Sequence, residues 1–275
     1  MLLLNNLMSL ETNNQLKNVL TLIENLDSST NFNVYIPSLQ KEFKFKQLTT
    51  EQLKRLLKTI IDSPIYSTEF ILTFNSIIRE NCLAQDLDTG VLTVLDKHII
   101  LFKMRIESIS PEYTFEIDDQ NKITVSLTKK LSELLNKQIK FDCETFSNDD
   151  YSVTCNLPSL NIENKFEEDL HQNTTFNINS SKDLRDIIGE TFVNEVTKFI
   201  TTLTIKNTPI DLTAYDFKSR VKIIEKLPIS LINNVIKYIE KYRALVQLLF
   251  TFELTMKDGS VLQQEITQDS SFFNT

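Results

Sequence analysis

The stretch Leu92-Thr-Val-Leu-Asp-Lys-His-Ile-Ile-Leu-Phe-Lys-Met-Arg-Ile106 decides the fold of this chain. Its apolar residues outnumber those that one face of a solvated helix holds, so we predict a helix that neighbouring elements cover on several sides. The helix ends in two basic residues, Lys103 and Arg105. We therefore expect an element that organises the core and then meets a partner.

Toward the N-terminus, the hydrophobic patterns predict helices on both sides of one hairpin. Apolar spacing favours an amphipathic helix over residues 10–26, and alternation favours a hairpin whose strands contain Phe32 to Ile36 and Phe43 to Phe45. A helix capped by Thr49 or Thr50 follows and stops at Asp62-Ser-Pro64. Another helix is expected over residues 68–83.

Beyond Pro111 the pattern changes to alternation, which indicates antiparallel strands. Residues 113–117 and 123–127 predict a hairpin around an Asp-Asp-Gln-Asn turn, and a short helix is expected near residues 130–135. Ile139 and Phe141, with Val153 and Cys155, suggest a second β pair. Residues 156–181 are polar and rich in Asn, and we interpret them as an irregular excursion.

The C-terminal third again favours helices. These are expected over residues 181–200 and 227–247, separated by a polar stretch, 201–216, and a short basic helix through Arg220. Residues 248–254 and 261–266 flank Lys257-Asp-Gly259, the clearest hairpin signal in the chain. The fold class is therefore α+β, helix-dominated, with several small antiparallel β-hairpins. We expect three segments, 1–110, 111–180 and 181–275.

Composition excludes several classes of function. The net charge of −8 argues against nucleic-acid binding. Only 3 Gly are present, too few for a Gly-rich phosphate loop. No run of about eighteen apolar residues predicts a membrane span, and the N-terminus lacks the pattern of a secretory signal. Three Cys residues do not form a disulfide framework and fit a reducing compartment.

Metal and catalytic sites are not expected. Cys143, Cys155 and His171 are zinc-ligand types, but neither Cys has a partner two residues away and a closed site needs four donors. His98 lies in the apolar helix, where a structural role is commoner than that of a base. Paired acids lie in polar segments, where solvated charge explains them. We expect no catalytic, cofactor-binding or metal-binding residues, and no cofactor.

Three blocks of sequence resemble one protein family. They are Tyr35 to Leu57 with its Pro-Ser turn, the helix Leu92 to Ser108 with its basic, Ser-containing end, and Glu225 to Ile239 with its Leu-Pro start. Their order is similar to that of the baseplate hub subunit family of T-even-like contractile-tailed bacteriophages. The blocks cover about a third of the chain and are structural patterns rather than a reactive signature.

The resemblance implies a non-enzymatic structural or assembly protein of a phage tail baseplate hub. Its partners would be other baseplate hub or tail proteins, without nucleic acid or membrane. It would be found in the virion or, during assembly, in the host cytoplasm. We expect Phe43, Phe45, Lys103 and Arg105 to bind the partner, because the basic helix end has no evident internal partner.

The sequence also allows a plainer interpretation of the basic helix end. On an ordinary surface, Arg105 would merely pair with a carboxylate such as Glu107 or Glu112. Two alternative functions are kept beside the baseplate hypothesis: a cytoplasmic interaction module unrelated to phage, and a metal-independent enzyme that uses dispersed carboxylates.

Overall fold

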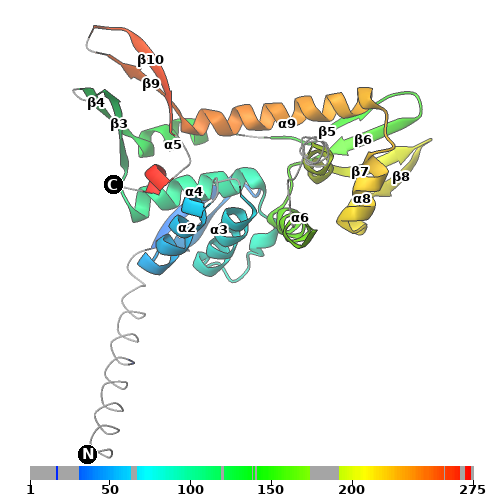
Figure 1. Ribbon diagram of the computed structural model, residues 1–275, viewed down its shortest axis with the longest axis horizontal. Helices are drawn as coiled ribbons and strands as arrows, with labels where there is room; N and C mark the ends of the chain where they lie inside the picture. The colour runs from blue at the N-terminus through cyan, green and yellow to red at the C-terminus, as the bar shows by residue number, and fades with distance from the viewer. Residues whose placement is uncertain are drawn as a thin grey trace, which may run out of the picture.

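The computed structural model describes residue 17 and residues 31–62, 67–118, 121–137, 139, 141–173, 192–256, 258–266 and 270–273. The helix expected over residues 10–26 lies outside them except for Lys17, which is helical. The long helix α9 (Ile229–Phe250) runs along the molecule and joins its two ends (Figure 1). Two hairpins lie at one end of α9, and a four-stranded sheet lies at the other (Figure 1).

Helix α4 (Val94–Ser108) is the segment predicted from Leu92 to Ile106. Twelve of its fifteen residues are buried, and Ile100 and Phe102 are 0% exposed. Thr93 caps the helix: its hydroxyl accepts the backbone N–H of Asp96, and the Asp96 carboxylate accepts the N–H of Thr93 at 2.7 Å. This capping box fixes where the helix begins, because it satisfies backbone donors that have no helical partner. The predicted burial is confirmed.

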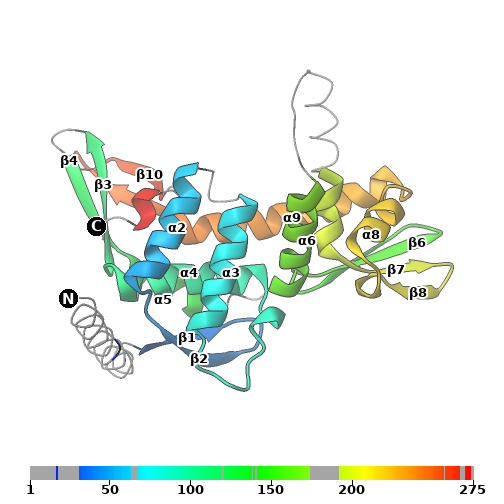
Figure 2. The same ribbon diagram turned by 60° about the horizontal axis from the view of Figure 1, so that its bottom comes forward.

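The N-terminal part packs a hairpin and two helices around α4 (Figure 2). Strands β1 (Asn31–Ile36) and β2 (Lys41–Lys46) pair antiparallel, with Val34 opposite Phe43, as the alternation predicts. Helices α2 (Thr50–Asp62) and α3 (Thr68–Asn81) follow at the expected places. A 3-10 turn, η2 (Thr89–Val91), leads into α4.

Two hairpins lie beside the C-terminal end of α9. Strands β3 (Glu112–Asp118) and β4 (Asn121–Ser126) form the first and lead into α5 (Leu127–Asn136), while β9 (Thr251–Thr255) and β10 (Val261–Glu265) form the second. The rings of Phe115 and Phe252 join them, with centroids 5.8 Å apart. A 3-10 turn, η4 (Ser270–Phe273), adds Phe272 to the core. Both hairpins confirm the sequence-based expectation.

The end of the molecule opposite the two hairpins contains a four-stranded sheet. The sequence pattern predicted only part of it. Strands β5 (Glu144–Ser147), β6 (Tyr151–Cys155), β7 (Ile200–Ile205) and β8 (Thr208–Asp211) pair in that order, all antiparallel. The assignment of Ile139 and Phe141 to a strand is wrong, because β6 pairs with β5 instead. The stretch 201–216 is also not a simple separator. Lys206 and Asn207 have φ values of 46° and 68°, which form the tight turn between β7 and β8.

The expectation of an irregular excursion after residue 156 is also wrong for the described residues. This stretch contains helix α6 (Leu160–Asn173), which begins where the backbone N–H of Glu163 bonds to the carbonyl of Ser159. Phe166 and Glu167 are buried on its inner side. Residues 174–181 lie outside the described part. Residues 192–199 are helical, and η3 (Leu212–Ala214) and α8 (Phe217–Ile224) precede α9.

The buried apolar side chains form one cluster with members in all three predicted segments, such as Ile100, Phe115 and Leu231. The division at residues 110 and 180 stays a prediction. The class is α+β with small antiparallel sheets, as expected. None of the described helices is long and apolar enough to span a bilayer.

Candidate partner-binding site

Phe43 and Phe45 lie on the inner face of the β1–β2 hairpin. Phe43 is 7% exposed and Phe45 is 0% exposed, and the Phe45 ring stacks on Phe32 at a centroid distance of 6.4 Å. Alternation correctly placed the aromatic side chains on one face, but that face packs on α4. In this conformation the two rings therefore support the hairpin from inside and offer no surface to a partner.

Arg105 is buried and donates hydrogen bonds to backbone carbonyls of this chain. Its Nε donates to the carbonyl of Phe272 at 3.1 Å, and its Nη1 donates to the carbonyls of Glu112 at 2.9 Å and of Ser110. The expectation that the basic helix end has no internal partner is therefore wrong for Arg105. Its bond to Glu112 goes to the backbone and not to the carboxylate. Arg105 ties the end of α4 to the start of β3 and to η4.

Lys103 is the one member of the predicted set whose side chain reaches the surface. Its ammonium group pairs with the carboxylate of Glu107 one turn later, and the two side chains are 23% and 30% exposed. Such a pair contributes little to stability because water screens it. Phe43, Phe45 and Arg105 are thus buried within the fold, and Lys103 places its charge at the surface. Their role in binding a partner stays a prediction.

Two groups of polar contacts clamp the β1–β2 hairpin onto α4. The sequence pattern did not predict them. At the start of α4, the Asp96 carboxylate accepts the hydroxyl of Ser38 at 2.6 Å and its backbone N–H at 3.2 Å. At the end, Gln47 donates to the carbonyl of Glu107 at 2.6 Å, and the N–H of Leu48 donates to the Ser108 hydroxyl at 2.9 Å. The Pro-Ser turn and the Ser-containing helix end of the family pattern therefore both lie at contacts between the hairpin and α4.

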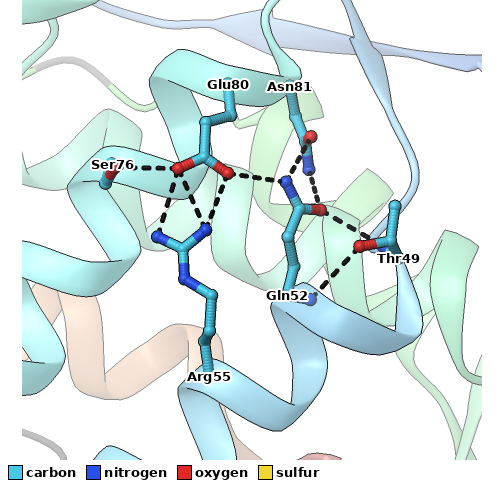
Figure 3. A network of polar contacts seen from close by, with 6 residues as sticks. All are labelled: Thr49, Gln52, Arg55, Ser76, Glu80 and Asn81. Carbon is cyan, nitrogen blue, oxygen red and sulfur yellow. Dashed lines mark hydrogen bonds and ion pairs between the residues drawn. The ribbon is translucent and has the colours of Figure 1, made fainter.

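A polar network fixes α2 against α3 (Figure 3). The side-chain amides of Gln52 and Asn81 exchange hydrogen bonds of 2.9 and 3.1 Å, although both residues are buried. Gln52 also completes a capping box with Thr49 and donates to Glu80 at 3.0 Å. Glu80 in turn holds Arg55 (Figure 3). These partners of Gln52 are all within the chain, so the network positions α2 rather than a ligand.

A cavity of about 620 Å³ lies where α3, α4 and α6 meet residues 194–199 and α9. Its apolar wall includes Phe74, Leu101, Phe199 and Val246. The charged lining residues are mostly joined in ion pairs: Lys97 with Glu163, Lys198 with Glu167, and Arg243 with Glu195. The cavity thus combines an apolar wall with charges that neutralise one another.

The most buried of these pairs joins α4 to α6. The side chains of Lys97 and Glu163 are 9% and 8% exposed. Burial raises the pKa of Glu163, but the charge of Lys97 and hydrogen bonds from Asn75 and Lys97 outweigh it, and the net effect lowers the pKa. Glu163 is therefore a carboxylate at neutral pH, with Asn75 donating to it at 2.9 Å.

The second pair extends the network across α6. Glu167 accepts Lys198 at 3.0 Å and the hydroxyl of Thr68 at 2.7 Å, and Lys198 lies 3.5 Å from the centroid of the Phe166 ring. These bonds join α3, α6 and residues 192–199 around one carboxylate. The irregular excursion expected here from the sequence is thus a docked helix.

His98 lines the cavity, and its ring is bonded to the backbone of its own helix. Its Nδ1 is 2.6 Å from the carbonyl of Val94, so Nδ1 carries the proton that makes this hydrogen bond. Burial and the charge of Lys97 lower the pKa of His98 to about 4. The imidazole is neutral at pH 7. A base with so low a pKa is poorly matched to proton abstraction at that pH.

The cysteines are dispersed over the fold. Cys143 is exposed, whereas Cys155 is buried in β6, and burial raises the pKa of its thiol to about 12. The side chain of His171 lies outside the described residues. Within the described part of the chain, no three His, Cys, Asp or Glu residues gather in a way that would hold a metal ion.

Comparison with known proteins identifies the family. A family model described as "T4 bacteriophage base plate protein" matches residues 29–274, from the β1–β2 hairpin to η4. No curated protein and no solved structure gives a significant match. The match covers nearly the whole chain, including all three blocks that carry the sequence resemblance. The chain therefore belongs to the T4 bacteriophage base plate protein family.

Proposed function

We propose that the protein is a component or an assembly factor of the hub, the central part of the tail baseplate. The family match over residues 29–274 carries this proposal, and the resemblance of three blocks to hub subunits narrows it from baseplate to hub. The protein would act by binding other hub or tail proteins. It would occupy the tail baseplate of the virion, or the host cytoplasm during assembly.

The contacts around the cavity support a non-enzymatic role. Lys97, Glu163, Lys198 and Glu167 are joined in ion pairs, and His98 is a weak base held by a backbone carbonyl. General acid–base or nucleophilic catalysis needs a group that is free to meet the substrate and has a suitable pKa. These side chains instead hold helices together. Their arrangement favours a scaffold over a catalytic centre.

We infer that the partner contacts the surface of α4 around Lys103 and Glu107. The clamp at Gln47, Leu48 and Ser108 holds this end of the helix in place, and Arg105 fixes it from inside. Phe43 and Phe45 then contribute by keeping the hairpin packed beneath it. A rigidly held surface charge favours recognition and association rate more than affinity.

Deletion of the gene, with complementation from a plasmid, tests the role in the phage. We expect tails without functional hubs in the deletion and normal particles on complementation. Mass spectrometry of purified virions then separates a component, present at fixed copy number, from an assembly factor, which is required but absent. Normal hubs and normal infectivity without the gene would contradict the proposal.

Charge variants of α4 test the surface itself. Lys103→Glu should reduce hub assembly in the complementation test while leaving the isolated protein folded by circular dichroism. The matched control is Lys103→Glu combined with Glu107→Lys, which restores the pair within the helix but keeps the surface charges reversed. If the double variant assembles normally, the pair matters only within the helix and the surface proposal is wrong.

A further inference from the structure

Strand β10 is an edge strand whose outer side is unpaired among the described residues. Within the described part of the chain it pairs as a strand only with β9, in a two-stranded sheet that projects beyond the end of α9 (Figure 1). Val261 is 63% exposed and Leu262 is 37% exposed, on opposite faces of the strand. A two-stranded hairpin is only marginally stable by itself in water, so an exposed apolar edge is a site for a further strand.

Three other edge strands carry a feature that discourages or occupies pairing, and β10 carries none of these features. Strand β8 contains Pro209 and β4 contains Lys122, residues that discourage pairing with another chain. The edge of β2 is engaged by the N–H of Leu83, which donates to the carbonyl of Lys44 at 2.9 Å. Strand β10 has the sequence Val-Leu-Gln-Gln-Glu, without Pro or Lys, and its only charge is at its end, on Glu265.

The register of the hairpin determines which backbone groups of β10 are free. The N–H of Met256 donates to the carbonyl of Ser260, and the N–H of Ile266 donates to the carbonyl of Phe250. Because hydrogen-bonded pairs alternate along an antiparallel ladder, Leu262 and Gln264 direct their backbone groups toward β9. The N–H and C=O groups of Val261, Gln263 and Glu265 consequently point outward from the sheet.

We propose that β10 pairs antiparallel with β10 of a second copy of this chain, which joins the two hairpins into a four-stranded sheet. In the register centred on Gln263, Val261 lies opposite Glu265 of the other copy and Gln263 lies opposite itself. All three outward-facing residues of each strand then exchange hydrogen bonds. No charge faces a like charge, whereas a parallel pairing would place Glu265 opposite Glu265.

This register gives three bonded pairs of outward-facing residues, whereas pairing centred on Leu262 or Gln264 gives two. A shift by one residue would place outward-facing groups opposite groups already bonded to β9, so the ladder between copies would not form. A shift that centres the pairing on Glu265 would bring two carboxylates together. The contact is small, because each copy contributes one strand of five residues. We therefore expect a weak dimer whose population depends on concentration.

Sedimentation equilibrium of the full chain over a range of concentrations tests the pairing. Gln263→Pro removes an outward N–H without removing a bond to β9, and it should raise the dissociation constant of the dimer at least about tenfold. The matched control, Gln263→Thr, keeps the N–H and should still dimerise. A wild-type chain that stays monomeric at the highest attainable concentration would overturn the proposal, as would a dimer that Gln263→Pro leaves unchanged.

Disulfide trapping tests the register separately, in a Cys143→Ser background that removes the exposed native thiol. Residues of a hydrogen-bonded antiparallel pair have Cα atoms about 5.5 Å apart, within the range that a disulfide spans. Gln263→Cys should therefore form a covalent dimer on mild oxidation, whereas Val261→Cys should not, because its partner is Glu265. Equal crosslinking of both variants would contradict the proposed register.

Discussion

Leu101 illustrates how strongly the fold depends on individual side chains of α4. It is 3% exposed and lines the cavity wall together with Phe74 and Phe199. We predict that Leu101→Ala lowers the free energy of unfolding by about 2–5 kcal/mol, because it removes buried apolar surface and enlarges an existing void. Urea unfolding would measure the loss. Leu248→Ala, at a position that is 54% exposed, is the control and should change stability by less than about 0.5 kcal/mol.

His98 makes stability depend on pH in a defined window. Its pKa is lowered from 6.5 to about 4, so the unfolded chain binds a proton at a pH where the folded protein does not. The neutral imidazole therefore contributes stability that is fully present above about pH 6.5 and is lost as the pH falls toward 4. The full difference amounts to about 3 kcal/mol.

We predict that urea unfolding between pH 7 and pH 5 shows stability falling with pH, and that His98→Gln flattens this dependence. The window separates His98 from Glu163, whose lowered pKa gives a stability contribution that is lost only below the ordinary range of a carboxyl group. The comparison uses the slope of the free energy of unfolding against pH. A uniform loss of stability in the variant therefore does not affect it. An unchanged slope would show that His98 protonates freely in the folded state.

At the scale of elements, the buried amides of Gln52 and Asn81 couple α2 to α3. Gln52→Ala leaves the Asn81 amide buried without this partner and should cost about 1–3 kcal/mol, whereas Asn81→Ala leaves Gln52 bonded to Thr49 and Glu80 and should cost less. The double variant should cost less than the sum of the two, by about 0.5 kcal/mol or more. Urea unfolding of the four proteins provides the cycle. Arg55→Ala, which removes an exposed ion pair with Glu80, should cost less than about 1 kcal/mol. Strict additivity of the two amide variants would contradict the coupling.

Local patterns predicted most of the elements. Alternating apolar residues identified the β1–β2, β3–β4 and β9–β10 hairpins, and helical spacing identified α2, α3, α4 and α9. These signals are strong because each element buries one face against the core. The β7–β8 hairpin was missed because Thr202 and Thr204 alternate with Leu203 and Ile205, and Thr reads as a polar residue although it favours strands.

Long-range contacts were the part that sequence patterns did not predict. Helix α6 was interpreted as a polar loop because the residues that dock it, Glu163 and Glu167, are charged. Their buried carboxylates are paired with Lys97 and Lys198, which lie far away in the sequence. Arg105 was assigned to the surface for the same reason. Its partners are backbone carbonyls, which leave no signal in the sequence. The bond from Ser38 to Asp96 joins residues far apart in the chain and likewise leaves no local signal.

At the scale of the whole molecule, α9 joins the two ends. Near the sheet, the hydroxyl of Tyr238 donates to the carbonyl of Asp142 at 3.3 Å, and its ring lies 4.9 Å from that of Phe141. At the other end, Phe250 packs edge-on against Phe102 of α4 at 5.6 Å. The buried face of α9 therefore packs against elements at both ends of the molecule. One cluster of buried apolar residues includes members from both ends.

The three native thiols report on whether the two ends unfold together. Cys82 follows α3 at one end, Cys155 lies in β6 at the other, and exposed Cys143 is an internal control for the reagent. Burial raises the pKa of both Cys82 and Cys155, so alkylation at neutral pH is slow in the folded protein. We predict that both become reactive over the same range of urea, because α9 and the shared core couple them. Peptide mass spectrometry after brief alkylation at each urea concentration would measure this. Reaction of Cys155 at clearly lower urea than Cys82 would instead show that the end with the four-stranded sheet unfolds as a separate unit.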